Sequence, residues 1–119
     1  MKADEIAPAS DHIIVLTTTN LEDEANRIAD ILIGRGMAAC VSILPPMRSV
    51  YRWKNKIERE EEFLIVIKSV AVNYPLIEQT IQENHSYEIP EIIAIPAAFI
   101  EDGYGGWLRK NSQTFIDNN

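Results

Sequence analysis

The sequence predicts a single α+β domain in which a four-stranded antiparallel sheet carries two helices on one face. Three observations lead to this fold. Short runs rich in β-branched residues alternate with stretches of helical period, and the two central strands form one long hairpin. The resulting order, β-α-β-β-α-β followed by an extra C-terminal helix, is the split βαβ arrangement of ferredoxin-like folds.

The first part of the chain predicts a buried strand and then a helix. Residues 12–18 (HIIVLTT) are nearly all apolar or β-branched, as expected of a strand inside a sheet. Thr19, with Glu22 three residues later, matches a capping box and predicts the start of a helix. Apolar residues recur at helical spacing as far as Leu32, and Gly36 is the predicted C-cap.

Residues 38–70 predict two long strands joined by a two-residue turn at Lys54 and Asn55. Asn tolerates the positive φ that such a turn demands. In this register the basic first arm meets the acidic second arm, so that Arg48 faces Glu61. Alternation places four residues of the first arm on one face: Met47, Ser49, Tyr51 and Trp53.

The length of this hairpin predicts an oligomer. Its first arm, Cys40 to Trp53, is fourteen residues, or roughly 46 Å at ~3.3 Å per residue. A compact chain of this size is only about 35 Å across. The arm must therefore bend at Pro45-Pro46 or project toward another chain, and an uncovered strand edge would invite aggregation. We therefore expect a homo-oligomer.

The last third of the chain predicts a helix, a strand and a final helix. The second helix spans residues 73–84, with Pro75 in its first turn, where the missing N–H costs nothing. Residues 90–95 are the fourth strand, ended by Pro96, and the glycine-rich segment 101–106 is expected to be a loop. The last helix begins at Tyr104 or Trp107 and is expected to present Trp107, Leu108, Asn111 and Phe115 on one side.

Composition narrows the class of protein. The formal charge of −7 argues against nucleic-acid binding through a basic surface. No apolar run approaches the ~20 residues of a membrane span. Cys40, the single cysteine, is expected in the core rather than as a reactive thiol, and it favours a cytoplasmic location. Residues 1–10 show no secretory signal and are expected to be a flexible tail, which leaves residues 11–119 as one domain.

The richest polar cluster, residues 85–91 (HSYEIPE), follows the second helix. An imidazole at His85 with carboxylates at Glu88 and Glu91 could ligate a divalent ion. The alternative is a solvated loop with a structural histidine. His12, at a strand start, is expected to be a partly exposed strand residue rather than a ligand.

Lys68 ends an apolar run, so its amine is expected to be partly buried and to need a carboxylate partner, for which Glu91 is the candidate. Beside Tyr87 it could bind an anion or act in acid–base chemistry; the alternative is a structural ion pair at a subunit interface. A run of four glutamates could attract cations or form a solvated face paired with Arg48 and Arg52: Glu58, Glu60, Glu61 and Glu62.

An enzyme is not expected. The sequence shows no nucleophile triad, no phosphate loop and no strong metal-finger spacing. An acylphosphatase-like hydrolase on this fold would need an arginine and an anion cradle in the first loop. Residues 17–20 (TTTN) supply neither arginine nor glycine.

Short stretches spread over about residues 12–107 are together more specific than any single motif. They are Ala38-Ala39-Cys40-Val41 followed by Pro45, Ser49-Val50-Tyr51 with Trp53, Lys56-Ile57-Glu58, Ile67-Lys68, His85 with Tyr87-Glu88, Pro90-Glu91, Ile95-Pro96, and Tyr104 with Trp107. On these residues the chain resembles the CutA (CutA1) divalent-cation tolerance proteins.

The resemblance implies a ferredoxin-like subunit that assembles into a homotrimer and acts in tolerance of divalent metals, notably copper. No cofactor is expected to be required, and the charge and hydropathy given above argue against a nucleic-acid or membrane partner. The trimer of this family resembles that of PII signalling proteins, which implies a regulatory, small-molecule-sensing role as the alternative. Lys68, Tyr87 and Glu91 match positions that the family tends to keep, and are expected to line an intersubunit cleft.

The metal ligands are where this sequence departs from its relatives. Some bacterial members use a cysteine on the first strand and two adjacent histidines after the second helix to bind copper. Here these positions are Thr17, Asn84 and His85, with Ser86 in place of the usual proline. Without a thiolate the site loses the soft ligand that copper(I) prefers. Weak binding through His85 and Glu88 is the expectation that remains.

Overall fold

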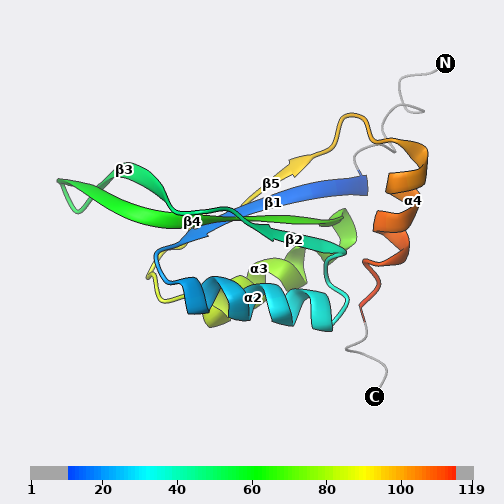
Figure 1. Cartoon of the computed structure of the whole chain (residues 1–119), viewed down its shortest axis with the longest axis horizontal. Helices are drawn as coiled ribbons and strands as arrows, with labels where there is room; N and C mark the ends of the chain where they lie inside the picture. Colours follow the sequence, from blue (N-terminus) through cyan, green and yellow to red (C-terminus); the bar gives the residue numbers. More distant parts are fainter. Residues whose placement is uncertain (1–10, 115–119) are drawn as a thin grey trace.

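The computed structural model describes residues 11–114 and confirms the predicted α+β, ferredoxin-like fold (Figure 1). Its elements are β1 (His12–Thr19), α2 (Glu22–Gly34), β2 (Cys40–Ile43), β3 (Met47–Trp53), β4 (Lys56–Val70), the 3-10 turn η2 (Ala71–Asn73), α3 (Tyr74–Asn84), β5 (Ile93–Pro96) and α4 (Asp102–Lys110). The flexible tail predicted for residues 1–10 and the place predicted for Phe115 lie outside the described residues.

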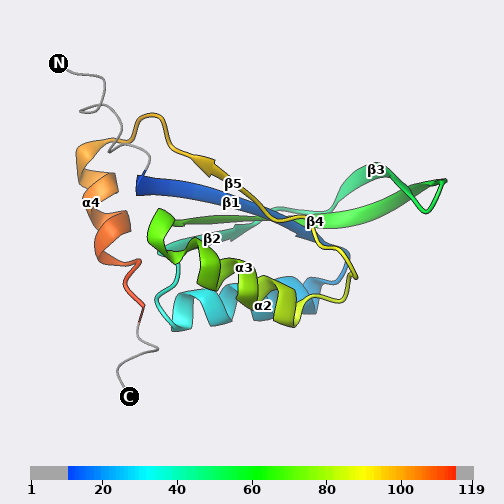
Figure 2. The ribbon, with the colours of Figure 1, turned by 180° about the vertical axis from the view of Figure 1, so that it is seen from behind.

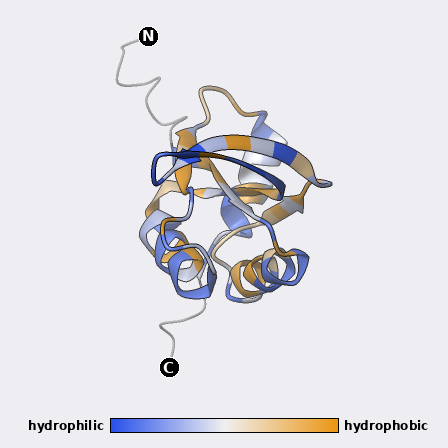
Figure 3. Cartoon of the chain, turned by 90° about the vertical axis from the view of Figure 1, so that its left-hand side faces the viewer, coloured by the Kyte–Doolittle hydropathy of each residue, from blue (hydrophilic) through white to orange (hydrophobic). Residues whose placement is uncertain are grey.

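The sheet is antiparallel, with the order β2-β4-β1-β5, and β3 pairs with the first half of β4. Helices α2 and α3 lie side by side against one face, as Figure 3 shows almost along their axes. The core fills the space between them and the sheet. Ile67, which pairs with Val15 and Val41, is fully buried there together with Ile28 and Ile77.

The turn and register predicted for the hairpin are confirmed. Lys54 and Asn55 both have positive φ, 51° and 68°, as a type I′ turn requires. Arg48 lies opposite Glu61 along the β3–β4 ladder. The sequence alternation and the turn residues therefore agree on one register.

The positive φ at Lys54 is a local strain that substitution can relieve. Replacing Lys54 and Asn55 together by Asn and Gly should raise the free energy of unfolding by up to ~1 kcal/mol, because this pair suits type I′ turns best. Lys54→Val should lower it, since a β-branched residue resists positive φ. Urea unfolding at one protein concentration measures both changes. A loss of stability in the Asn-Gly variant would contradict this account of the turn.

The first arm was predicted as one long strand, and the structure divides it. Pro45 and Pro46 lie between β2 and β3 and lack the N–H that a continuous ladder would need. β4 runs through both parts, pairing with β3 and then with β2. The β3–β4 hairpin, here called the arm, projects from the body and gives the molecule extents of 49 × 38 × 23 Å (Figure 1).

The start of α2 differs from the prediction. The helix begins at Glu22, Leu21 is its N-cap, and no side chain caps it. Thr19 is instead the last residue of β1, and its hydroxyl donates to Glu24 Oε2 at 2.6 Å. The predicted capping box is therefore wrong: Thr19 lies two residues before the N-cap, and its hydroxyl oxygen accepts from the N–H of Leu21 at 3.3 Å rather than from a first-turn N–H of the helix.

The predicted glycine ends α2, but one position later than predicted: Arg35 is the C-cap and Gly36 follows it. Gly36 has φ of 70°, and its N–H donates to Ile33 O at 3.1 Å while Met37 N–H donates to Leu32 O at 2.9 Å. These two bonds form a Schellman motif, in which a glycine meets the positive φ without steric cost.

The segment 101–106, predicted as a glycine-rich loop, is the beginning of α4. Glu101 is the N-cap, and its carboxylate accepts hydrogen bonds from the N–H groups of Gly103 and Tyr104 at 3.0 and 2.7 Å. Two of the helix's free N–H groups are thus satisfied, which offsets the low helix propensity of its three glycines. Of the face predicted for this helix, Leu108 is buried and Trp107 is 46% exposed.

Glu101 also gives α4 a predictable pH response. The two backbone hydrogen bonds hold the pKa of its carboxyl below the usual range. A carboxylate with a lowered pKa in the folded state stabilises the fold above its unfolded pKa of about 4.3, and this is lost as the pH falls through the folded value. Glu101→Gln should therefore lower the protection of α4 amides against exchange at pH 7, relative to their intrinsic rates, and abolish the loss of that protection as Glu101 is protonated. Equal exchange in both proteins would contradict the cap.

Candidate functional site

The segment that follows α3 is fixed by a buried histidine. His85 has extended backbone (φ −103°, ψ 140°) and a fully buried side chain. Its Nε2–H donates to Thr18 O at 2.7 Å, and its Nδ1 accepts from the N–H of Tyr87 at 3.0 Å. The ring therefore ties to β1 the segment that Figure 2 shows leading from α3 to β5, and the hydroxyl of the next-but-one residue, Tyr87, contacts Glu62 of β4.

Glu24 on α2 completes this cluster from the other side. It is 3% exposed, accepts from Thr19 and from the hydroxyl of Ser86 at 3.3 Å, and lies 3.3 Å from Nδ1 of His85. Arg27 approaches its other oxygen at 3.9 Å. The sequence reasoning missed Glu24, because a glutamate in the first turn of a helix is normally explained by the helix dipole.

The structure does not bring the two predicted metal ligands into one site. His85 is buried with both nitrogens engaged, whereas the side chain of Glu88 is 72% exposed and lies 4.0 Å from the Lys54 amine. Within residues 11–114 no three His, Cys, Asp or Glu residues are grouped so that they could hold a metal ion. Thr17 faces the core with its hydroxyl buried, and the amide of Asn84 donates to Thr80 O at 2.8 Å.

A cavity of about 720 Å³ lies between the inner face of the arm and the segment after α3. Its described lining includes no basic residue, and five of its residues are glutamates: Glu58, Glu60, Glu62, Glu88 and Glu91. Tyr51, Trp53 and Tyr87 contribute aromatic side chains. The cavity is therefore acidic and partly aromatic.

Tyr87 links the carboxylates of this cavity. Its hydroxyl lies 2.7 Å from Glu62 Oε2 and 3.3 Å from Glu60 Oε1. Burial, and then the bond to Glu62, raises the pKa of Tyr87 well above its usual range, so the phenol stays a donor. Burial together with the Glu62 charge also raises the pKa of Glu91. In the described chain no lysine or arginine lies within 4.0 Å of Glu60, Glu62 or Glu91, and Lys54 approaches only the exposed Glu88.

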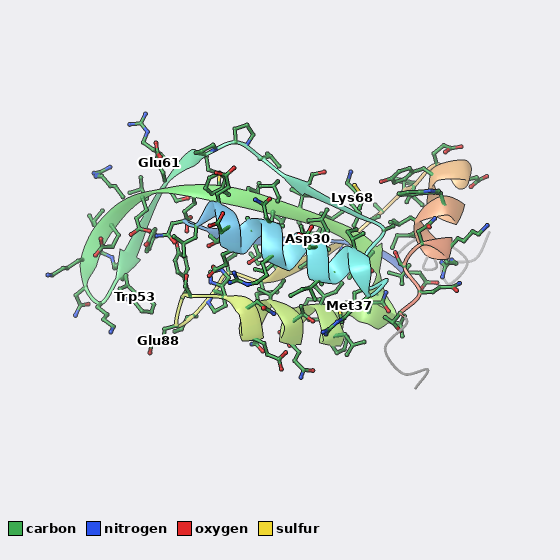
Figure 4. The ribbon with its side chains drawn as sticks, turned by 60° about the horizontal axis from the view of Figure 1, so that its bottom comes forward. Asp30, Met37, Trp53, Glu61, Lys68 and Glu88 are labelled. Atoms are coloured by element: carbon green, nitrogen blue, oxygen red, sulfur yellow. The ribbon has the colours of Figure 1, made fainter. Side chains whose placement is uncertain are left out.

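The acidic run does not form the single face paired with arginines that one alternative proposed. Because strand residues alternate, Glu58, Glu60 and Glu62 line the cavity, whereas Glu61 lies on the outer face opposite Arg48. Figure 4 shows Trp53 and Glu61 on opposite sides of the arm. The alternation of side chains along a strand would have predicted from the sequence that Glu61 lies on the opposite face from Glu60 and Glu62.

Within one subunit, the three residues predicted to line an intersubunit cleft lie in two places. Tyr87 and Glu91 line the cavity. Lys68 pairs across the sheet with Ile14 and Cys40, at the other end of β4, and Figure 4 shows it far from Glu88.

The predicted ion pair between Lys68 and Glu91 is therefore wrong within one subunit. The half-buried Lys68 amine instead lies 6.0 Å from the ring centre of Tyr104 on α4. This distance suits a cation–π contact.

Two further predictions concern single residues. His12 is 7% exposed rather than partly exposed, and its Nε2 donates to Gly105 O at 3.0 Å, which docks α4 on the end of β1. Cys40 is only half-buried and free, with its sulfur 3.9 Å from the hydroxyl of Ser42.

Comparison with known proteins identifies the family. A family model described as "CutA1 divalent ion tolerance protein" matches residues 13–111, which includes every strand pair of the body, the arm and α4. This chain belongs to the CutA1 family. The resemblance of its short stretches to CutA proteins is thereby confirmed.

Members of the CutA1 family from distant organisms are similar to this chain in sequence, and one solved structure is similar to it in fold. The divalent-cation tolerance protein CutA of Thermus thermophilus is 35% identical over 83% of this chain and 96% of its own length. The chloroplastic protein CutA of Arabidopsis thaliana is 28% identical over 95% of this chain and 62% of its own length. The crystal structure of CutA1 from Shewanella sp. SIB1 matches with a TM-score of 0.83 and 36% identity, over 87% of this chain and 97% of that one.

Proposed function

We propose that this chain acts as a homotrimer in divalent-cation tolerance and catalyses no reaction. The observation that carries the assembly is an uncovered sheet face. Since α2 and α3 occupy the other face, several apolar side chains are left without a covering layer: Ile14, Leu16, Leu64, Val66, Ile93 and Ile95. A contiguous apolar face of this kind favours a protein partner, and the family supplies the role in cation tolerance.

The arm supports the same proposal. It extends the molecule to 49 Å along its long axis and leaves the outer edge of β3 without a strand beside it in the described chain. A second copy would cover this edge and remove the risk of uncontrolled strand pairing.

Light scattering at micromolar concentration tests the assembly. The expected mass is three times the 13.5 kDa of one chain. A monomer at that concentration would contradict the proposal outright. A dimer would support a homo-oligomer but contradict a trimer, since the number three rests on the resemblance to the family.

We further propose that divalent cations, including copper, bind this chain weakly at His85 and Glu88. His85 must leave its hydrogen bonds to Thr18 and Tyr87 before it can coordinate an ion. Two such bonds at about 1 kcal/mol each weaken binding by about 30-fold. The carboxylate of Glu88 is exposed, and its one ion pair, with Lys54 at 4.0 Å, is exposed as well, so an ion can replace it.

Calorimetric titration with copper(II) and zinc tests this weak site. Glu88→Gln removes a ligand without touching the buried cluster and should reduce the heat of binding, whereas Glu83→Gln, an exposed glutamate on α3, should not. No binding at millimolar ion would reject the site. Tight binding that Glu88→Gln leaves unchanged would place the metal elsewhere.

A PII-like sensing role is the second candidate, and Lys68 favours it. Within the described chain its amine has no carboxylate within 4.0 Å and lies on the uncovered face of the sheet, beside Tyr104. In a trimer, Lys68 of one subunit could complete a cleft with Tyr87 and Glu91 of another. A thermal-shift screen of nucleotides and small carboxylates, with Lys68→Ala as control, tests this role; a shift that persists in the variant would reject Lys68.

The compartment is also a proposal. No helix among residues 11–114 is long and apolar enough to cross a membrane. We propose a cytoplasmic location from the single cysteine, whereas a structural relative from Archaeoglobus fulgidus is described as periplasmic. Fractionation of cells that express the full chain would decide between these compartments.

A further inference from the structure

The cavity between the inner face of the arm and the segment after α3 has the size of a small-molecule site. Its volume of about 720 Å³ lies within the range of roughly 300–1,000 Å³ that is typical of ligand pockets. Glu58, Glu60 and Glu62 line it from alternate positions of β4. All of the lining comes from one subunit, so the site can be considered without reference to the assembly proposed above.

Glu62 is a buried carboxylate with an unused acceptor in this cavity. The residue is 5% exposed, and its Oε2 accepts from the Tyr87 hydroxyl at 2.7 Å. Among residues 11–114 no hydrogen bond reaches its other oxygen, Oε1, and no lysine or arginine lies within 4.0 Å of either oxygen. A carboxylate buried in this way is costly unless a cation pairs with it.

Aromatic rings complete the lining of the cavity. Tyr51 and Trp53 share the inner face of β3, and Tyr87 lies across from them. The faces of such rings carry partial negative charge and attract cations. Rings and carboxylates together, without a basic residue in the described lining, favour a cation that has an apolar body.

The rim of the cavity already shows how these groups hold an ammonium. The Lys54 amine lies 5.6 Å from the ring centre of Trp53 and 4.0 Å from Oε1 of Glu88, and both of these residues line the cavity. Figure 4 shows Trp53 and Glu88 on the same side of the arm, opposite Glu61. An aliphatic ammonium thus occupies the exposed end, whereas the deeper carboxylates have no counterpart.

The separation of the carboxylates favours an extended organic cation over a metal ion. Within residues 11–114 no three His, Cys, Asp or Glu residues are grouped so that they could hold one ion. Positions two apart along a strand are about 6.6 Å apart, which suits two ammonium groups joined by a short aliphatic chain. Such amines carry their charge at pH 7, and their methylene groups can pack on aromatic rings.

We propose that the cavity binds an aliphatic diamine or polyamine, with one ammonium group between Glu60 and Glu62 and the next beside Glu58. The first ammonium donates to the unused oxygen of Glu62. The methylene chain between the ammonium groups lies on the rings of Tyr51 and Tyr87. This site goes beyond the proposed role in tolerance of metal cations, because its ligand is organic and its ligating groups do not include His85.

Calorimetric titration of the full chain with butane-1,4-diamine at pH 7, in the presence of a chelator, tests the proposal. Butylamine has a single ammonium group and should bind at least about tenfold more weakly, since it lacks one charge-assisted hydrogen bond. Butane-1,4-diol has the same chain without charge and should give no heat of binding. Magnesium carries the same charge as the diamine and should not displace it when the chelator is left out.

Two neighbouring glutamates supply a matched pair of variants. Glu62→Gln keeps the shape of the side chain and should raise the dissociation constant of the diamine at least about tenfold. Glu61→Gln removes the same charge one residue away, on the outer face, and should leave the dissociation constant unchanged. Circular dichroism confirms that each variant is folded. If Glu62→Gln fails to fold, Glu60→Gln replaces it with the same expected loss.

The outcomes separate a built amine site from the general attraction of cations to an acidic protein. Equal weakening by Glu62→Gln and Glu61→Gln, or equal binding of butylamine and the diamine, would overturn the proposal. Displacement of the diamine by magnesium, or no binding at millimolar diamine, would overturn it as well. Each of these results would leave the proposed trimer and the weak metal site standing, since light scattering and the copper titration test those separately.

Discussion

Replacing Ile67 by alanine lowers the expected free energy of unfolding by about 2–5 kcal/mol, because the substitution leaves a cavity in the centre of the sheet. Ile67 is fully buried on the helix-facing side of β4, between Val15 on β1 and Val41 on β2. Neither neighbour can collapse into the space without disturbing a ladder on each side. Urea unfolding at a fixed protein concentration measures the loss.

Val72→Ala provides the matched control for this core substitution. Val72 is 81% exposed in η2, so its truncation should change the free energy of unfolding by less than about 0.5 kcal/mol. Equal losses in the two variants would show that Ile67 does not lie in the core described here.

Replacing His85 by alanine is the second large expected effect, a loss of about 2–4 kcal/mol. The variant removes a fully buried ring and leaves Thr18 O without its donor and the N–H of Tyr87 without its acceptor. The phenol of Tyr87 should then lose its fixed position between Glu60 and Glu62. Thermal and urea unfolding measure the loss, and tyrosine fluorescence reports the freed ring.

The His85 result also separates a structural role from a metal role. If His85 acts through its hydrogen bonds, the loss is the same in chelator and in excess zinc. Ser86→Ala, which removes only a 3.3 Å contact to Glu24, should cost less than about 1 kcal/mol. A loss that appears only in metal-loaded protein would restore His85 as a resident ligand.

The local features of the fold could be predicted because short-range rules decide them. The turn at Lys54 and Asn55 needs residues that tolerate positive φ, and Gly36 ends α2 for the same reason. Thr19 and Glu101 show where such rules fail. Thr19 ends β1 and accepts from the N–H of Leu21 instead of capping α2. The Glu101 side chain caps α4 and so makes a helix of a segment whose glycine content predicted a loop.

The candidate site was predicted less well than the fold, since it depends on distances between segments. The importance of residues 85–91 was visible in the sequence, but the partners of His85 and Tyr87 come from β1, α2 and β4. Lys68 and Glu91 have opposite charges and so suggested an ion pair. The strand register, however, places Lys68 near the C-terminal end of β4, whereas Glu91 lies beside its first half. The two-residue alternation of a strand is the one sequence signal that separates Glu61 from Glu58, Glu60 and Glu62.

The division of the arm from the body at Pro45-Pro46 has a consequence for the order of folding. β3 and β4 pair residues that are neighbours in the chain, whereas β1 must find β4 across the whole of α2 and the arm. Closing the shorter loop costs less entropy, so we expect the hairpin to pair before the central sheet is complete. The surface that would meet a second chain is thus formed early, and association can begin on a subunit whose core is still assembling.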